Sequence, residues 1–193
     1  LEFLQGKDKN LTVLSSSDGK SQLLFSAKYQ GKVFTTTTDG LNGNSIGFIN
    51  YDAFDCAEND HINVFGGENR FWLGPEGGKF SVFFSKNAEQ SVENWFTPKA
   101  IDTEEWKLIA TDKTSVAVEK ETVLVNSRET TLKMKLKRSV TLLSVADIEN
   151  LLSIQLPDNV RHSAYETVNA VTNLNNFEWN QKTGTVCIWM LDM

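Results

Sequence analysis

Residues 59–84 read NDHINVFGGENRFWLGPEGGKFSVFF and contain five Gly, one Pro, two Glu and a single His, Arg and Trp. This mixture is poor for core packing and is typical of a functional loop carried between strands. Read as an extended strand, residues 68–73 alternate, so Glu68, Arg70 and Trp72 share one face. The stretch therefore predicts a glycine-flanked strand with one strongly polar face.

A carboxylate, a guanidinium and an indole in a row are the chemistry of a sugar site. The charged groups bind ring hydroxyls, and the aromatic ring stacks on the apolar face of the sugar. The alternative is an interior ion pair beside a half-buried Trp. If the three side chains Glu68, Arg70 and Trp72 line an open concavity, the first interpretation holds. If their heads are buried and mutually paired, a structural sandwich domain, with this strand as an ion-paired seam, is favoured.

The glycine pairs 66–67 and 77–78 predict sharp turns that bring Glu76 back toward Glu68. Two carboxylates about 5–5.5 Å apart would suit a retaining glycosidase, and about 6.5–9.5 Å an inverting one. His61 is one of only two His and is a third catalytic candidate, with a structural hydrogen bond as the alternative. Trp95, next to Phe96, is either a stacking platform for a ring or part of the core.

Composition excludes some classes of function. The net charge is −6 with no dense run of Lys or Arg, which argues against nucleic acid as a partner. Residues 133–138 alternate basic and apolar side chains, which indicates the solvated face of a strand. No apolar run approaches the roughly 20 residues that cross a bilayer. Cys56 and Cys187 lack metal-ligand spacing and are expected to be buried thiols, and we expect no metal and no cofactor.

Short β-branched or aromatic segments separated by turn residues predict an antiparallel β-sandwich, organised as one domain over residues 1–193. One short helix is expected after Ser144, with Asp147 in capping-box position. The expected strands cover residues 11–15, 21–28, 32–38, 68–73, 105–111, 114–125, 130–143, 163–173 and 185–191.

The strand at residues 185–191 is so apolar that it is expected to have a neighbour on each side. An earlier strand, a second copy of the chain or further chain beyond Met193 would supply the missing neighbour. The sequence leaves these alternatives open, so a homo-oligomer and a missing C-terminal half are both carried forward.

Five motifs along the chain are GGENRFWLGPEGG (66–78), WFTP (95–98), YETVN (165–169), VTN (171–173) and IWML (188–191). Together they resemble an uncharacterised family of bacterial exported proteins that is assigned to the galactose-mutarotase-like superfamily. The resemblance covers essentially the whole chain, but the members of the family are roughly twice as long, so the chain is similar to their first half. The resemblance implies a β-supersandwich with a concave carbohydrate-binding face, and a periplasmic or cell-surface location.

The mutarotases use a His and a Glu on opposite sides of the sugar ring. This chain has Ile188-Trp-Met-Leu where their His-containing strand would lie, and the corresponding Glu would fall beyond Met193. Three functions therefore stay open. The first is a carbohydrate-binding protein that uses Glu68, Arg70, Trp72 and Trp95. The second is a sugar epimerase or glycosidase that uses Glu68, Glu76 and His61. The third is a structural sandwich domain without a ligand.

Overall fold

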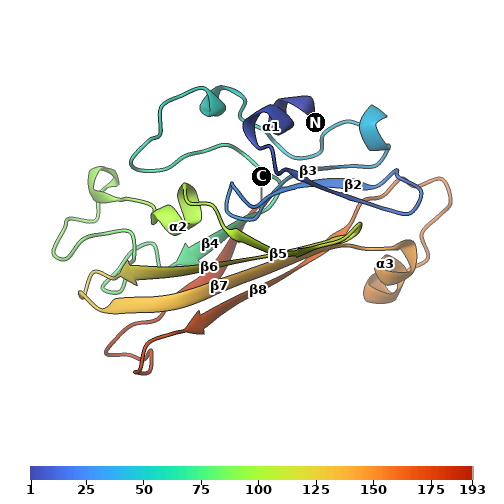
Figure 1. The fold of residues 1–193 in the computed structure, drawn as a ribbon. Helices are drawn as coiled ribbons and strands as arrows, with labels where there is room; N and C mark the ends of the chain where they lie inside the picture. The colour runs from blue at the N-terminus through green and yellow to red at the C-terminus, as the bar shows by residue number, and fades with distance from the viewer. Residues whose placement is uncertain (193) are drawn as a thin grey trace.

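The structure is a computed structural model that describes residues 1–192, and it is an all-β sandwich of two antiparallel layers (Figure 1). This confirms the predicted fold class. The first layer contains β1 (Thr12–Ser15), β2 (Gln22–Ser26), β3 (Lys32–Thr37), β4 (Arg70–Gly74) and β9 (Cys187–Leu191). The second contains β5 (Lys107–Thr111), β6 (Ser115–Val125), β7 (Thr131–Leu142) and β8 (Tyr165–Asn173).

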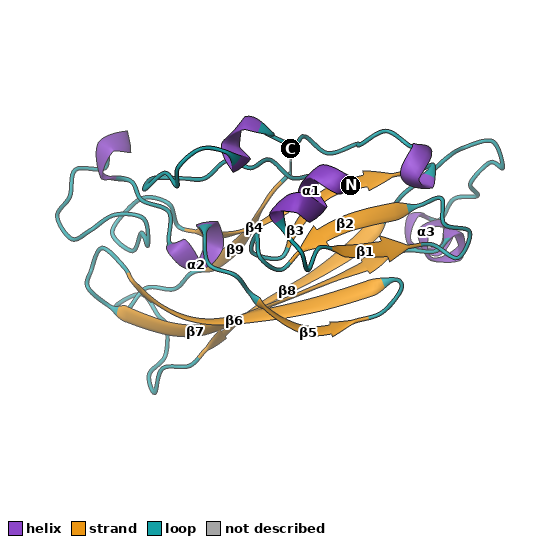
Figure 2. Cartoon of the chain, turned by 45° about the horizontal axis from the view of Figure 1, so that its top comes forward, coloured by secondary structure: helices purple, strands orange, loops and turns teal. Residues whose placement is uncertain are grey.

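The first layer is continuous because an antiparallel bridge between Val33 and Asn69 joins β3 to the residue just before β4. The strands β1, β2 and β3 pair in order, and β4 pairs with β9, with Arg70 opposite Leu191. The layer thus links the first forty residues to the last strand of the described chain, and β4 and β9 lie side by side beyond β3 (Figure 2).

The second layer is a meander in the order β5-β6-β7-β8. Along β7, Leu132, Met134 and Leu136 are fully buried, while Lys133 and Lys137 on the opposite face are exposed. This alternation is the one expected of a strand that has one face on the core and one in solvent. The prediction that the lysine-rich stretch forms a solvated strand face is confirmed.

One core lies between the layers and takes side chains from both. Phe71 of β4 packs edge-on against Trp106, with ring centroids 5.1 Å apart. Both rings are buried. Burial of a large apolar side chain contributes about 1.5–3 kcal/mol relative to leaving it in water. A second, smaller cluster around Leu4, Leu24 and Phe34 covers the outer face of β2 and β3.

The predicted helix is α3 (Val145–Leu152). The Ser144 hydroxyl accepts a hydrogen bond from the Asp147 backbone N–H at 3.2 Å, and Asp147 accepts one from the Ser144 N–H at 3.0 Å. The capping box is confirmed. Two further helices, α1 (Glu2–Lys7) and α2 (Lys99–Asp102), were not predicted, because six and four residues are too few to show a helical period.

The prediction of two buried thiols is wrong. Cys56 and Cys187 are both exposed and free. Cys56 follows a short 3-10 turn, Asp52–Phe54, in a surface loop. Cys187 lies in β9, which among residues 1–192 pairs with β4 alone. Trp189 of the same strand is 52% exposed, so no earlier strand provides the second neighbour that its apolar sequence led us to expect.

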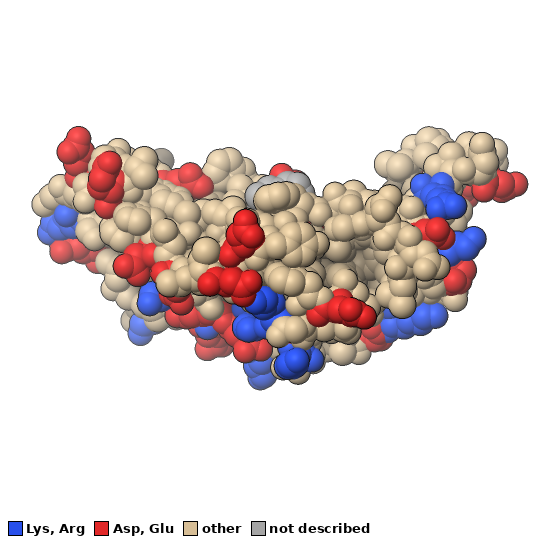
Figure 3. Space-filling view, turned by 90° about the horizontal axis from the view of Figure 1, so that it is seen from above, with Lys and Arg blue, Asp and Glu red and all other residues tan. Residues whose placement is uncertain are grey.

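On the face seen in Figure 3, basic and acidic side chains are interspersed, and Lys and Arg form no continuous patch. In the described part of the chain, no helix combines the length and the apolar character that crossing a bilayer requires.

Candidate functional site

The strand predicted at residues 68–73 exists as β4, but its polar face is not open. Arg70 is 2% exposed and Trp72 is 1% exposed. Arg70 Nη2 donates to Asp102 Oδ1 at 2.7 Å and to the Ile101 carbonyl oxygen at 3.0 Å, and its guanidinium lies 4.5 Å from the centroid of the Trp72 ring. The expectation that these side chains line a hollow is therefore wrong, and they form the interior ion pair of the alternative interpretation.

The partner of Arg70 comes from α2, 32 residues further along the chain, and this explains the error. Asp102 is 3% exposed and also accepts hydrogen bonds from the Asn63 backbone and side-chain amides. The pKa of Arg70 is below its ordinary value, because burial lowers it. The hydrogen bond and the charge of Asp102 oppose this shift only in part. A covered strand face needs such a partner, since an isolated buried charge is costly.

Glu68 is turned away from this pair. Its carboxylate accepts hydrogen bonds from the Thr36 backbone N–H at 2.7 Å and from the Thr36 hydroxyl at 2.9 Å. Burial first, and then the negative charge of Glu68, raise the pKa of Tyr165 above its usual 10.0. Glu68 thus faces β3 and β8, whereas Arg70 faces α2, and the three predicted ligand-binding side chains do not converge.

Glu76 does not return to Glu68 as predicted. Its Oε1 accepts a hydrogen bond from the Trp72 indole N–H at 2.6 Å. Glu68 and Trp72 are four residue steps apart in extended chain, which is about 13 Å at roughly 3.3 Å per residue. The two carboxylates are bound to different parts of the fold and share no cleft. The predicted Glu68 and Glu76 catalytic pair is contradicted by this geometry.

Lys32 is a buried charge that the sequence did not single out. It is fully buried, and no described residue accepts a hydrogen bond from its Nζ. Burial first, then repulsion from Arg70, lowers the pKa of Lys32 well below 10.5, and Asp102 partly opposes this. Gly67 leaves room for this side chain, because a Cβ at Gly67 would lie 2.5 Å from Lys32 Cδ.

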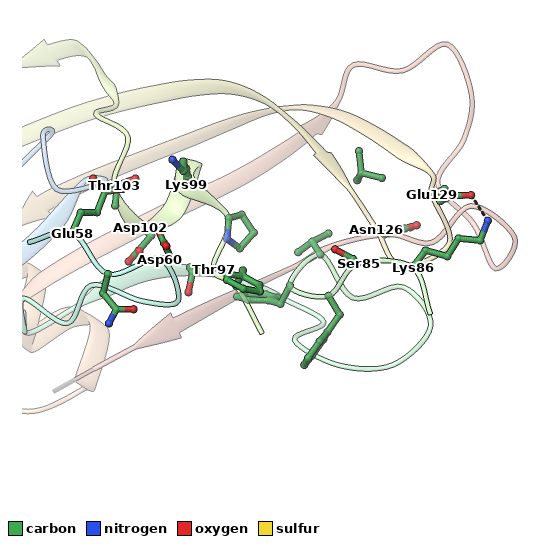
Figure 4. Close-up of a pocket in the computed structure, with 17 residues that line it drawn as sticks. Glu58, Asp60, Ser85, Lys86, Thr97, Lys99, Asp102, Thr103, Asn126 and Glu129 are labelled. Carbon is green, nitrogen blue, oxygen red and sulfur yellow. Dashed lines mark hydrogen bonds and ion pairs between the residues drawn. The ribbon is translucent and has the colours of Figure 1, made fainter. Parts of the chain in front are cut away.

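An open groove of about 630 Å³ lies near the predicted residues. It lies outside β4, next to the loop that carries His61. Its walls are the segments 58–60, 82–86, 96–103 and 125–129. In Figure 4, Asp60, Thr97, Lys99 and Asp102 lie at one end and Ser85, Lys86, Asn126 and Glu129 at the other. We call this space the groove.

His61 supports an aromatic ring on the wall of the groove. Its ring stacks on Phe96 with centroids 4.4 Å apart and an angle of 18° between the planes. His61 Nδ1 lies 2.7 Å from the Trp95 carbonyl oxygen, so Nδ1 carries the proton and donates. Phe96 lines the groove and is 44% exposed. His61 therefore has the structural hydrogen bond of the alternative interpretation.

Trp95 belongs to the core rather than to the groove. Its ring stacks on Phe83, with centroids 5.2 Å apart and planes at 11°. The sequence indicated that this pair of adjacent aromatic residues contains a possible stacking ring, with Trp95 as the candidate. In the structure, Phe96 is the exposed ring and Trp95 is the packed one. Adjacent residues of an irregular loop point in directions that sequence alone does not fix.

Three charged side chains on the walls of the groove are free to bind a ligand. Within residues 1–192, the side chains of Glu58, Asp60 and Lys99 make no hydrogen bond or ion pair, whereas Lys86 pairs with Glu129 (Figure 4). Carboxylates accept and an ammonium donates hydrogen bonds. No three or more His, Cys, Asp or Glu residues of the described chain are grouped closely enough to hold a metal ion.

Comparison with known proteins gives one match. A protein family described as a family of unknown function, DUF6786, matches residues 1–193. No curated protein and no solved structure matches the chain.

Proposed function

We propose that the chain, which belongs to the DUF6786 family of unknown function, is a carbohydrate-binding protein that holds a sugar ring in the groove. The ring would stack on Phe96, and its hydroxyls would bind the free side chains beside it. The observation that carries the proposal is the His61–Phe96 stack, which presents an aromatic ring to an open, polar-walled space.

The stack supports the proposal because a platform has to be rigid. His61 covers one face of the Phe96 ring and is itself anchored on the Trp95 carbonyl. The other face is then the one available to a ligand. A sugar ring presents apolar C–H groups on one side, and aromatic side chains bind such surfaces without a hydrogen bond.

The polar walls support the proposal for a second reason. Sugar hydroxyls donate and accept at once, so a site for them needs both kinds of partner. Asp60 and Glu58 supply acceptors, and Lys99 supplies donors. A groove of about 630 Å³ also falls within the roughly 300–1,000 Å³ of ligand sites in general.

The carboxylate pair of the enzyme alternative is not supported, since Glu68 and Glu76 bind different elements. We therefore propose binding without catalysis. Arg70 and Trp72 are left with a structural role. The resemblance to mutarotase-like proteins and the exported location stay predictions.

The test is a glycan array followed by titration calorimetry of the sugars it detects. We expect Phe96→Ala to weaken binding at least tenfold, which corresponds to about 1.4 kcal/mol. Phe48→Ala is the matched control, because Phe48 is also an exposed ring, at 56%, but does not line the groove. Thermal unfolding checks that both variants fold. The proposal fails if no sugar binds, or if the two variants bind equally well.

A further inference from the structure

A second cavity of about 220 Å³ adjoins the groove and shares Glu58, Asp102 and Thr103 with it. It lies against the smaller apolar cluster on the outer face of β2 and β3, where Tyr29 and Phe65 form part of its wall. Its volume is below the roughly 300 Å³ at which separate ligand sites begin. It is therefore better suited to be an extension of the groove than a site of its own.

Gln30 gives this cavity a buried acceptor without a donor. Gln30 lines the cavity and is 1% exposed. Its Nε2 donates to the carbonyl oxygens of Lys28 at 3.2 Å and Glu104 at 3.3 Å, which fixes the orientation of the amide. No described residue donates to Oε1. A buried acceptor left without a hydrogen bond costs about 1–3 kcal/mol.

The surroundings decide which kind of donor fits. Lys28 and Glu58 both line the cavity, whereas the buried Lys32 does not. One cation and one free carboxylate on the walls do not favour a charged ligand of either sign. The Asp102 carboxylate is already occupied by Arg70 and Asn63. A neutral hydroxyl is the donor that matches Gln30 Oε1 here.

The walls favour a ring that carries this hydroxyl. Tyr29 and Phe65 pack edge to face, with centroids 4.9 Å apart, and both border the cavity. Aromatic walls with a few placed polar groups are typical of small-molecule sites, and a sugar ring fits such walls. The same chemistry thus occurs twice, once at Phe96 and once at Tyr29.

We infer that the groove and the second cavity are two subsites of one site, and that the ligand is an oligosaccharide of at least two linked rings. One ring stacks on Phe96, and a hydroxyl of the next ring donates to Gln30 Oε1. This inference rests on the proposed function and adds the size of the ligand to it.

The first experiment measures the dependence of affinity on ligand length. Glucose and the malto- and cello-oligosaccharides of two to six units are titrated by calorimetry into the wild-type chain. We expect at least a tenfold gain in affinity between one ring and two or three rings. Gln30→Asn withdraws the amide by one methylene, and Asn tolerates the backbone φ of 59° at this position. We expect this variant to lose the gain and to keep the affinity for one ring.

The second experiment uses Cys56, a free and exposed thiol that borders the second cavity. In a Cys187→Ser variant, the rate of reaction of Cys56 with dithiobis(nitrobenzoate) is measured with and without each saccharide. We expect protection of at least threefold by the longer saccharides and none by glucose. The matched control is Cys187, which lies in β9 and borders neither space, followed in a Cys56→Ser variant.

The outcomes separate the two proposals. If no sugar binds, either in the glycan array or in these titrations, or if Phe96→Ala binds as tightly as Phe48→Ala, the proposed function falls and this inference falls with it. If saccharides bind through Phe96 but length brings no gain and Cys56 stays unprotected, only the inference is overturned, and Gln30 Oε1 is satisfied by water alone. A gain with length that Gln30→Asn removes supports both.

Discussion

Among single residues, Lys32 contributes the most unusual electrostatics of the described chain. Its ammonium lies near one buried carboxylate, Asp102, which already pairs with Arg70. The pKa of Lys32 is therefore well below 10.5 in the folded state, while the unfolded chain keeps the ordinary value. Between the two values the unfolded state binds more protons, so the stability of the fold rises with pH across this window.

We expect Lys32→Met to raise the free energy of unfolding at pH 7, because the methionine needs no proton and no partner. The difference in free energy of unfolding between Lys32→Met and wild type should decrease as the pH rises toward 10.5. The decrease should be about 1.4 kcal/mol per pH unit at pH values between the lowered pKa of Lys32 and 10.5. Urea unfolding of both proteins at pH 7, 8, 9 and 10 measures it. Lys9→Met, at an exposed position, should leave the pH dependence of the free energy of unfolding the same as in wild type. A variant less stable than wild type at pH 7, with the wild-type slope, would contradict this account.

At the scale of elements, α3 is the helix with local capping contacts. The helix α3 has the capping box of Ser144 and Asp147 at its beginning, and Ser153 with a left-handed φ of 54° at its end. Of its apolar side chains, Ile148 is buried, but Leu151 and Leu152 are more than 60% exposed. Few side chains of α3 pack against the rest of the protein, so the caps contribute a large part of the stability of the helix.

Ser144→Ala should destabilise α3 by about 1 kcal/mol, since the Asp147 backbone N–H loses the Ser144 hydroxyl as its acceptor. Amide hydrogen exchange is the appropriate measurement, because α3 can open without global unfolding. We expect faster exchange in residues 148–152 and unchanged exchange in β7. Ser153→Gly should act in the opposite direction, as glycine adopts the left-handed conformation without strain. Equal exchange in wild type and Ser144→Ala would show that packing, not capping, stabilises the helix.

At the scale of the whole molecule, the two layers depend on one core. Leu136 of β7 is fully buried in the same cluster as Trp72 of β4 and Trp106. A substitution in the second layer should therefore also change the fluorescence of tryptophans such as Trp72, which belongs to the first layer. The layers should unfold together in one cooperative transition.

We expect Leu136→Ala to lower the free energy of unfolding by about 2–5 kcal/mol through the cavity it leaves. Tryptophan fluorescence and far-UV circular dichroism should give the same urea midpoint, because the core is shared. Leu151→Ala, at an exposed position, should change the midpoint little. Two separate midpoints would show that the layers are independent.

The sequence determined the scaffold of this protein. The alternation along residues 130–143 and the turn residues between short apolar segments predicted β7 and its neighbours within a few residues. The capping box at Ser144 predicted α3. These features were readable because periodicity and capping are local, and each depends on residues within one turn or one strand.

The tertiary structure alone decided which side chains are free. The alternation of β4 placed Arg70 and Trp72 on one face, as predicted, but only the folded chain brings Asp102 of α2 over that face and closes it. The same packing leaves Phe96 exposed and stacks the partly buried Trp95 on Phe83. Burial of a strand face depends on which distant segment covers it, and no local pattern encodes that choice.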